Sequence, residues 1–262
     1  MIKMLKRGLL GSFSILSLST VIWIVLLTNP AISYANETQM GQITVFHNGQ
    51  LEDGTETVVN NALSLIKNAE IYDENFKIQL CLNDDKIYPN LHPVPGGAAY
   101  AFLNKAVVFA SKPNFKNNKA EFRWEINNNE LRSYNLTQLL AHEFTHNLQY
   151  NYDPTYYIKT SLGTLNWKLE GHAEYVARGF KNDGALTEKI KFYLEEEKKA
   201  HQGIPVFTLE DGTIQNLSYF KYALVVQYLF EVKHLDYGEL TKLNPNLDTH
   251  YSEMIEWGDE SK

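Results

Sequence analysis

Residues Leu136 to Tyr150 read LTQLLAHEFTHNLQY and contain the pattern H-E-x-x-H between His142 and His146. Residues four apart lie above one another on the same face of a helix, so both imidazoles could bind one metal ion. Glu143 follows the first histidine and could act as a base on a water molecule. The pattern is typical of zinc hydrolases, but it also recurs by chance on ordinary helices.

The overall composition is that of a globular protein. The chain has 262 residues, of which 44% are hydrophobic and 21% charged. This predicts one large domain, or a compact domain with a helical extension. Three of the 24 Lys and Arg residues precede residue 36 and none of the 31 Asp and Glu does, so the rest carries a net charge of −10. Nucleic acid is therefore not expected as a partner, because phosphate binding needs a basic surface.

Residues 1–35 have the features of a secretory signal peptide. Three basic residues precede the uncharged run from Leu9 to Leu27, and Ser33-Tyr34-Ala35 forms a small-residue cleavage site. We expect cleavage after Ala35. The alternative is an uncleaved membrane anchor over residues 9–27, because this run comes close to the length that spans a bilayer. In either case residues 36–262 would face outward, secreted or anchored.

The first half of the mature chain predicts a small mixed β-sheet with a helix. Alternating or β-branched runs predict strands, and apolar residues at helical spacing predict one helix. Turn residues predict a loop over Pro89 to Gly97, and polar residues predict an exposed turn over Asn114 to Ala120. The expected strands are residues 42–47, 76–82, 98–102, 106–110 and 122–126, and the expected helix is residues 55–69.

The second half is expected to be mainly helical. The helix that carries H-E-x-x-H begins near Asn135, whose side chain can cap it. Further helices are expected over residues 166–178, 187–200, 218–232 and 248–257, with an irregular stretch over residues 203–212. The predicted fold class is α+β, with an α/β subdomain over residues 36–133 and a helical subdomain with the zinc site over residues 134–262.

A catalytic zinc site needs a third protein ligand and an open position for water. One family places a third histidine six residues after the second, but that position is Tyr152. Farther on, residues 167–175 read WKLEGHAEY. This segment resembles the glutamate-zincins, the superfamily of thermolysin and the zinc aminopeptidases. The resemblance implies a zincin-like fold, Zn²⁺ as cofactor, peptide or protein substrates, and Glu170 as the third ligand after His142 and His146.

The same resemblance assigns a role to Glu174, one turn after Glu170. In this superfamily an acidic residue at that place orients the first histidine, and such a bond fixes the imidazole tautomer. Alternatively, both glutamates simply lie on a solvent-exposed face of the helix and have no role at a metal. His172 projects toward the opposite side of the helix, at about 100° per residue, and is not expected to share the metal.

A second motif, residues 219–225, reads YFKYALV. It resembles the Y-x-K-G-A-L-V stretch of the zinc aminopeptidases, in which the tyrosine hydroxyl helps to hold the oxyanion. Tyr219 occupies that place, which makes it the candidate second catalytic residue beside Glu143. Tyr222 replaces the glycine and lies one turn away, so it is the alternative donor. Both tyrosines could instead be core aromatics of an amphipathic helix.

The resemblance also predicts how a substrate is held. In this superfamily an edge strand upstream of the metal helix pairs with the extended substrate, and Ala98, Ala99 and Tyr100 are the candidates here. The aminopeptidases carry a glutamate in this region, which binds the free amino end. The corresponding residues 96–101 read GGAAYA and contain no acid. We therefore expect an endopeptidase. The alternatives are an aminopeptidase and a non-catalytic peptide-binding module with zinc.

Overall fold

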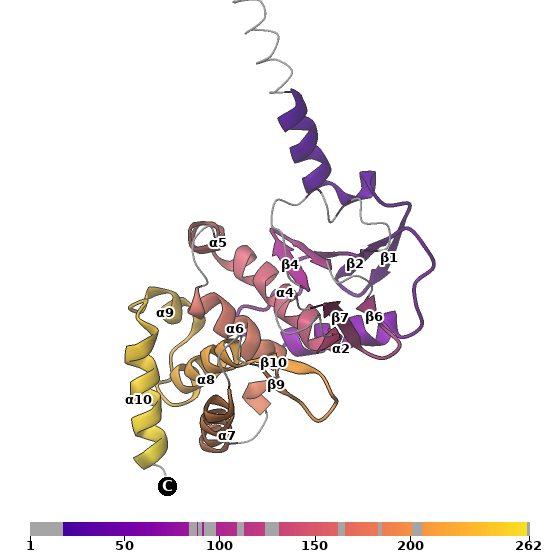
Figure 1. Ribbon diagram of the computed structural model, residues 1–262. Helices are drawn as coiled ribbons and strands as arrows, with labels where there is room; N and C mark the ends of the chain where they lie inside the picture. Colours follow the sequence, from indigo (N-terminus) through magenta and orange to yellow (C-terminus); the bar gives the residue numbers. More distant parts are fainter. Residues whose placement is uncertain are drawn as a thin grey trace, which may run out of the picture.

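The computed structural model describes residues 18–83, 88, 91, 98–108, 113–123, 131–161, 166–182, 185–200 and 206–260. Within them the fold is α+β, with a mixed sheet in the N-terminal half and a mainly helical C-terminal half (Figure 1). The predicted fold class is confirmed. Most of the predicted loop over Pro89 to Gly97 and the first 17 residues of the expected signal peptide lie outside the described residues.

The main sheet has five strands in the order β1-β2-β3-β5-β4. Strands β2, β3 and β5 are parallel, and β1 and β4 pair antiparallel with them at the two edges. Helix α2 (Thr55–Ile66) connects β2 to β3, as the predicted strand, helix, strand order requires. The strand bounds are Asn36–Met40 for β1, Ile43–His47 for β2, Ile78–Cys81 for β3, Ala99–Phe102 for β4 and Lys105–Val108 for β5.

Both faces of this sheet are covered by apolar groups. Side chains alternate between the faces of a strand, and one face packs against α2 in the main core. The opposite face packs against Tyr34 and Tyr88 in a smaller cluster. The first face presents Ile43, Val45, Ile78, Leu80 and Ala106, and the second presents Phe46, Cys81 and Val107.

Two smaller sheets were not fully predicted. The first contains β6 (Pro113–Asn114), β7 (Lys119–Arg123) and β8 (Leu131–Asn135), all antiparallel. The expectation of an exposed turn over Asn114 to Ala120 is wrong in part, because both ends of that segment pair as strands. The second sheet pairs β9 (Val206–Thr208) with β10 (Ile214–Asn216), so the stretch expected to be irregular contains a strand.

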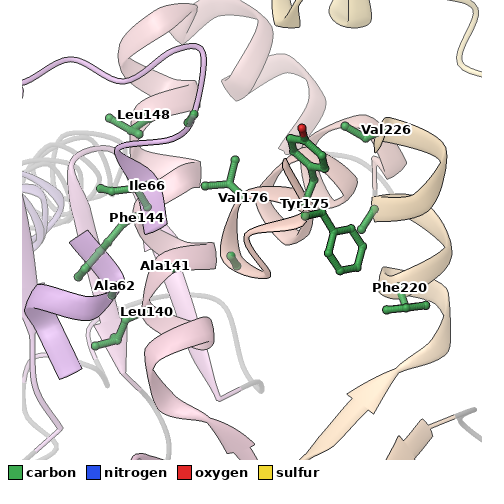
Figure 2. Close-up of a cluster of buried hydrophobic side chains, with 14 of the residues drawn as sticks. Ala62, Ile66, Leu140, Ala141, Phe144, Leu148, Tyr175, Val176, Phe220 and Val226 are labelled. Atoms are coloured by element: carbon green, nitrogen blue, oxygen red, sulfur yellow. The ribbon is translucent and has the colours of Figure 1, made fainter. Parts of the chain in front are cut away.

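The helices α2, α4, α6 and α8 pack in succession and form most of the core. Figure 2 shows Ile66 of α2 beside Leu148 and Phe144 of α4. Val176 of α6 lies on the side toward α4, and Tyr175 on the side toward α8. The bounds are Leu136–Tyr152 for α4, Pro154–Ser161 for α5, Trp167–Ala177 for α6, Leu186–Lys199 for α7, Leu217–Glu231 for α8, Tyr237–Lys242 for α9 and Leu247–Glu260 for α10. Among the described helices, none has both the length and the hydropathy that a membrane crossing requires.

Gly171 sets the distance between α6 and α8. A β-carbon at this position would lie 2.7 Å from the backbone oxygen of Tyr222. A contact this short with backbone cannot be relieved by a side-chain rotation, so any larger residue would push the helices apart. The glycine of the WKLEGHAEY motif therefore brings α8, with its tyrosines, close to the helix that carries Glu170.

Candidate zinc site

The H-E-x-x-H residues lie in the middle of α4, which packs against α2, α6 and β4. Asn135 caps the helix as predicted, with its side-chain oxygen accepting a hydrogen bond from the Gln138 N–H at 3.1 Å. The side chains of His142, Glu143 and His146 are buried in this packing. Buried polar groups are costly unless they have partners, so the partners of these three residues define the site.

Three potential ligand atoms converge beside α4. Nε2 of His142 lies 3.1 Å from Nε2 of His146 and 3.2 Å from a carboxylate oxygen of Glu170. The same oxygen lies 3.4 Å from Nε2 of His146. Ligands at zinc distances of about 2.0–2.1 Å in a tetrahedron are separated by about 3.3–3.4 Å. The triangle of donor atoms therefore fits one face of a zinc coordination tetrahedron.

The hydrogen bonds on the far side of each imidazole leave these atoms as electron-pair donors. Nδ1 of His142 lies 3.1 Å from a carboxylate oxygen of Glu174, and Nδ1 of His146 lies 2.7 Å from Oε1 of Gln149. Both partners are acceptors, so each neutral imidazole carries its proton on Nδ1 and presents a lone pair at Nε2. Two lone pairs and the oxygen of Glu170 then face one another, an arrangement that a cation stabilises.

The electrostatics of the site also favour a positive charge. Burial opposes the charged form of His142, but Glu170 and Glu174 outweigh it and raise the pKa of His142 well above its usual value. The pKa of Glu170 is lowered, because the two histidines outweigh the effect of burial. His142, His146 and Glu170 are thus positioned to bind a metal ion, and their donor set is the one that catalytic zinc uses.

A family model described as Peptidase M9, collagenase, matches residues 104–253, more than half of the chain. The match includes the three ligand residues, Glu143 and both tyrosines of α8. The chain belongs to this collagenase family. The family consists of zinc metallopeptidases of the gluzincin class, so the protein is a zinc-dependent hydrolase, in agreement with the predicted superfamily and cofactor. A search of curated proteins and a search of solved structures found no match.

Glu174 lies where the sequence comparison with the glutamate-zincins expects it. Besides contacting His142, its carboxylate accepts hydrogen bonds from Nε of Arg178 at 2.5 Å and from the amide of Gln215 at 2.9 Å. Burial disfavours its charge, but Arg178 and His142 outweigh burial and lower the pKa of Glu174 to about 2. A carboxylate held by three partners is well placed to orient the His142 ring, the role that the resemblance implies for it.

The partner of His146 was not predicted. Gln149 is one turn farther along α4, and its amide donates to the backbone oxygen of Leu169 at 2.9 Å and lies 3.1 Å from Nδ1 of His172. These contacts fix which end of the amide faces His146. His172 is fully buried and is not among the three residues whose ligand atoms converge. The i, i+3 spacing of His146 and Gln149 was a signal in the sequence, and the contacts from α6 were not.

Glu143 lies between the donor triangle and strand β4. Its carboxylate accepts a hydrogen bond from the backbone N–H of Ala101. Burial raises the pKa of Glu143, and the nearby histidines only partly offset this. A carboxyl whose pKa is raised toward neutrality is a better proton acceptor during turnover. The environment therefore suits the expected role of a general base.

Tyr219 lines a cavity of about 290 Å³ together with His142 and Glu143. Its ring centroid is 5.8 Å from that of His142. Burial raises the pKa of Tyr219, and Glu170, Glu143 and other nearby acidic groups raise it further, so the hydroxyl stays protonated and can donate. Ala98 and Ala99 line the same cavity.

Tyr222 is placed differently. Its ring centroid is 6.1 Å from that of Tyr219, and it lines a separate hollow with Tyr193 and Lys221. The geometry therefore favours Tyr219 over Tyr222 as the donor to a developing oxyanion.

Replacing Tyr219 by phenylalanine is expected to lower kcat by roughly 10²-fold with a smaller change in KM, because the lost hydrogen bond forms mainly in the transition state. Tyr222→Phe is the matched control, since it removes the same hydroxyl from a neighbouring turn, and should leave kcat within about two-fold. Steady-state kinetics on one peptide measure both. A large loss of kcat in Tyr222→Phe alone would exchange the two roles.

Tyr157 on α5 is a site residue that the sequence analysis missed. Its ring centroid is 6.2 Å from that of His146. Tyr157 therefore lies beside the second histidine of the motif, whereas Tyr219 lies beside the first. Burial raises the pKa of Tyr157, and Glu143, Tyr100 and Glu170 raise it further, which places a neutral hydroxyl near the catalytic carboxylates. The signal in the sequence was its position in the segment between His146 and Glu170, the second and third expected metal ligands.

Proposed function

We propose that this protein is a zinc endopeptidase that binds extended segments of polypeptide along strand β4 and cleaves them beside Glu143. The observation that carries the proposal is the position of Glu143, which lies between the donor triangle and the outer edge of β4, an edge that no other described strand pairs with. A substrate strand on that edge would pass directly over the base and the metal ligands.

The pairing of β4 defines which backbone groups are free. Leu103 and Asn104 form a two-residue turn, so Phe102 and Lys105 are the first hydrogen-bonded pair of the hairpin. Antiparallel pairs alternate between bonded and non-bonded, so the backbone groups of Ala99 and Ala101 point to the outer edge. Glu143 takes the N–H of Ala101, which leaves three outward groups for strand addition by a substrate, independent of its sequence.

Asn147 ties this edge strand to the metal helix. Its amide nitrogen donates to the backbone oxygens of Leu103 at 2.9 Å and Lys105 at 3.0 Å. Asn147 is fully buried and immediately follows His146. The turn of the β4–β5 hairpin is therefore held at a fixed distance from the donor triangle.

The chemistry follows from the residues around the metal site. When bound, zinc supplies a Lewis acid that polarises the scissile carbonyl and lowers the pKa of water. Glu143 would take a proton from the attacking water and pass it to the leaving amine. The hydroxyl of Tyr219 would donate a hydrogen bond to the oxygen that gains negative charge. Glu174 and Gln149 would hold the two imidazoles in position throughout.

The acidic groups around the cavity support internal cleavage. The carboxylates among its described lining residues are those of Glu143 and Glu174. Glu174 is already paired with Arg178, and Glu143 is needed as the base. A free substrate ammonium would have no charge partner here and would be costly to desolvate. The basic residues and the apolar run within the first 35 residues support a location of the peptidase domain outside the cytoplasm.

Peptides that differ only at their amino ends test this proposal. We expect a series with free and acetylated amino termini to be cleaved at the same internal bonds and at similar rates. Gelatin and an unfolded peptide library would extend the comparison to longer substrates. Mass spectrometry of the products identifies each cleaved bond. Cleavage restricted to the first bond and abolished by acetylation would instead indicate an aminopeptidase.

A further inference from the structure

We propose that the folded protein keeps its N-terminal apolar segment, and that this segment inserts into a lipid bilayer and holds the peptidase domain at the membrane surface. The sequence leaves cleavage after Ala35 and an uncleaved anchor as alternatives. The contacts of residues 27–34 favour the anchor. The inference does not depend on the peptidase reaction, because its tests use no substrate.

Tyr34 completes the second face of the main sheet. Parallel strands are normally covered on both faces, and here the face opposite α2 presents Phe46, Cys81 and Val107. The Tyr34 side chain is 7% exposed, and its ring centroid is 6.0 Å from that of Phe46 and 5.6 Å from that of Tyr88. Cleavage after Ala35 would remove this ring and expose apolar sheet surface to water.

Hydrogen bonds join the same segment to the domain. The Tyr34 hydroxyl donates to the backbone oxygen of Leu82 at 2.7 Å, and the Tyr88 hydroxyl donates to that of Leu27 at 2.6 Å. Leu27 is 4% exposed, and Pro30 between them is also buried. Loss of residues 1–35 would break both of these buried hydrogen bonds, and each lost hydrogen bond costs free energy. Residues 27–34 therefore behave as part of the domain.

The residues just before this segment are largely exposed, although the indole N–H of Trp23 donates to the backbone oxygen of Leu91 at 2.9 Å. Residues 18–28 are helical, and in Figure 1 this helix, in indigo, projects away from the domain. Five consecutive apolar residues, 21–25, are 39–56% exposed and together point in every direction around the helix axis. A helix that is apolar all round is stable when buried in protein or in lipid, and its described part is not buried in this protein.

The sequence identifies lipid as the partner that fits this helix. The uncharged run from Leu9 to Leu27 comes close to the roughly 20 residues that span a bilayer. Lys3, Lys6 and Arg7 precede it, and basic residues favour the cytoplasmic side of a membrane. This orientation places the domain on the outer side, directly after the buried residues 27–34.

Fractionation of cells that express the unmodified full chain tests the inference. We expect the intact 30.1 kDa chain in the membrane fraction, resistant to high salt and alkaline wash and released by detergent. Intact mass and N-terminal sequencing identify the species. A predominantly soluble product that begins at Asn36 would overturn the proposal.

A pair of variants tests whether the segment belongs to the fold. In the detergent-solubilised full chain, Tyr34→Ala should lower Tm by roughly 10 °C, because it removes a buried aromatic ring. Ile32→Ala is the matched control, since Ile32 lies in the same segment and is 55% exposed, and should leave Tm nearly unchanged. Equal Tm values for the two variants would overturn the proposal. The fractionation needs no variant, so it decides the question even where Tyr34→Ala does not fold.

Discussion

Glu143→Gln is expected to lower kcat/KM for peptide hydrolysis by roughly 10²- to 10⁴-fold, about 3–5 kcal/mol of transition-state stabilisation. Glutamine has nearly the same size and can still accept the hydrogen bond from the Ala101 N–H, but it cannot take a proton from water. The three ligand residues are unchanged, so zinc content and Tm should match those of the unmodified chain. Kinetics, metal analysis and thermal unfolding on the same preparation measure the three quantities.

The two controls give this result its meaning. A variant that loses both zinc and activity would show only that the site was damaged. A variant that keeps zinc and loses activity shows that the loss comes from the missing general base. Turnover like that of the unmodified chain in zinc-loaded Glu143→Gln would remove Glu143 from the mechanism.

Glu170→Ala is expected to lower zinc affinity by more than the roughly 10- to 100-fold that loss of an outer hydrogen-bond partner costs. The variant removes one of three protein ligands and a negative charge that lies within 3.4 Å of both imidazoles. Activity should fall with zinc occupancy. Zinc titration with a competing chelator measures the affinity.

Glu188→Ala is a suitable control for the third ligand. Glu188 is exposed in the first turn of α7, away from the site. The substitution removes the same type of side chain there, so zinc affinity should not change. Full zinc occupancy in Glu170→Ala would refute the ligand assignment and would point to Glu174 or His172 instead.

The parts of this site that the sequence predicted are those set by local geometry. The i, i+4 spacing of His142 and His146 places them on one face of any helix, and the cap at Asn135 needs only a side chain and the next turn. Glu170 and Glu174 are likewise one turn apart on one helix face. The family resemblance implied that this face points toward the histidines of α4. The predicted helices and the strand, helix, strand order rest on the same local periodicities.

The parts that it did not predict depend on contacts between distant segments. Strand β9 has three residues and is recognisable only from its pairing with β10. Tyr157 approaches His146 because α5 folds back over the site, a path that no local pattern specifies. The burial of Tyr34 also depends on the sheet that it covers, which is why the sequence alone favoured cleavage next to it.

Reversible removal of zinc tests the central claim most directly. Cleavage of one internally quenched peptide by the full chain should be lost when a chelator removes the metal, and restored by about one equivalent of zinc per chain. Magnesium should not restore it, because two imidazoles and a carboxylate suit zinc better than a hard oxygen-seeking cation. Undiminished cleavage by protein that metal analysis shows to be zinc-free would contradict the account.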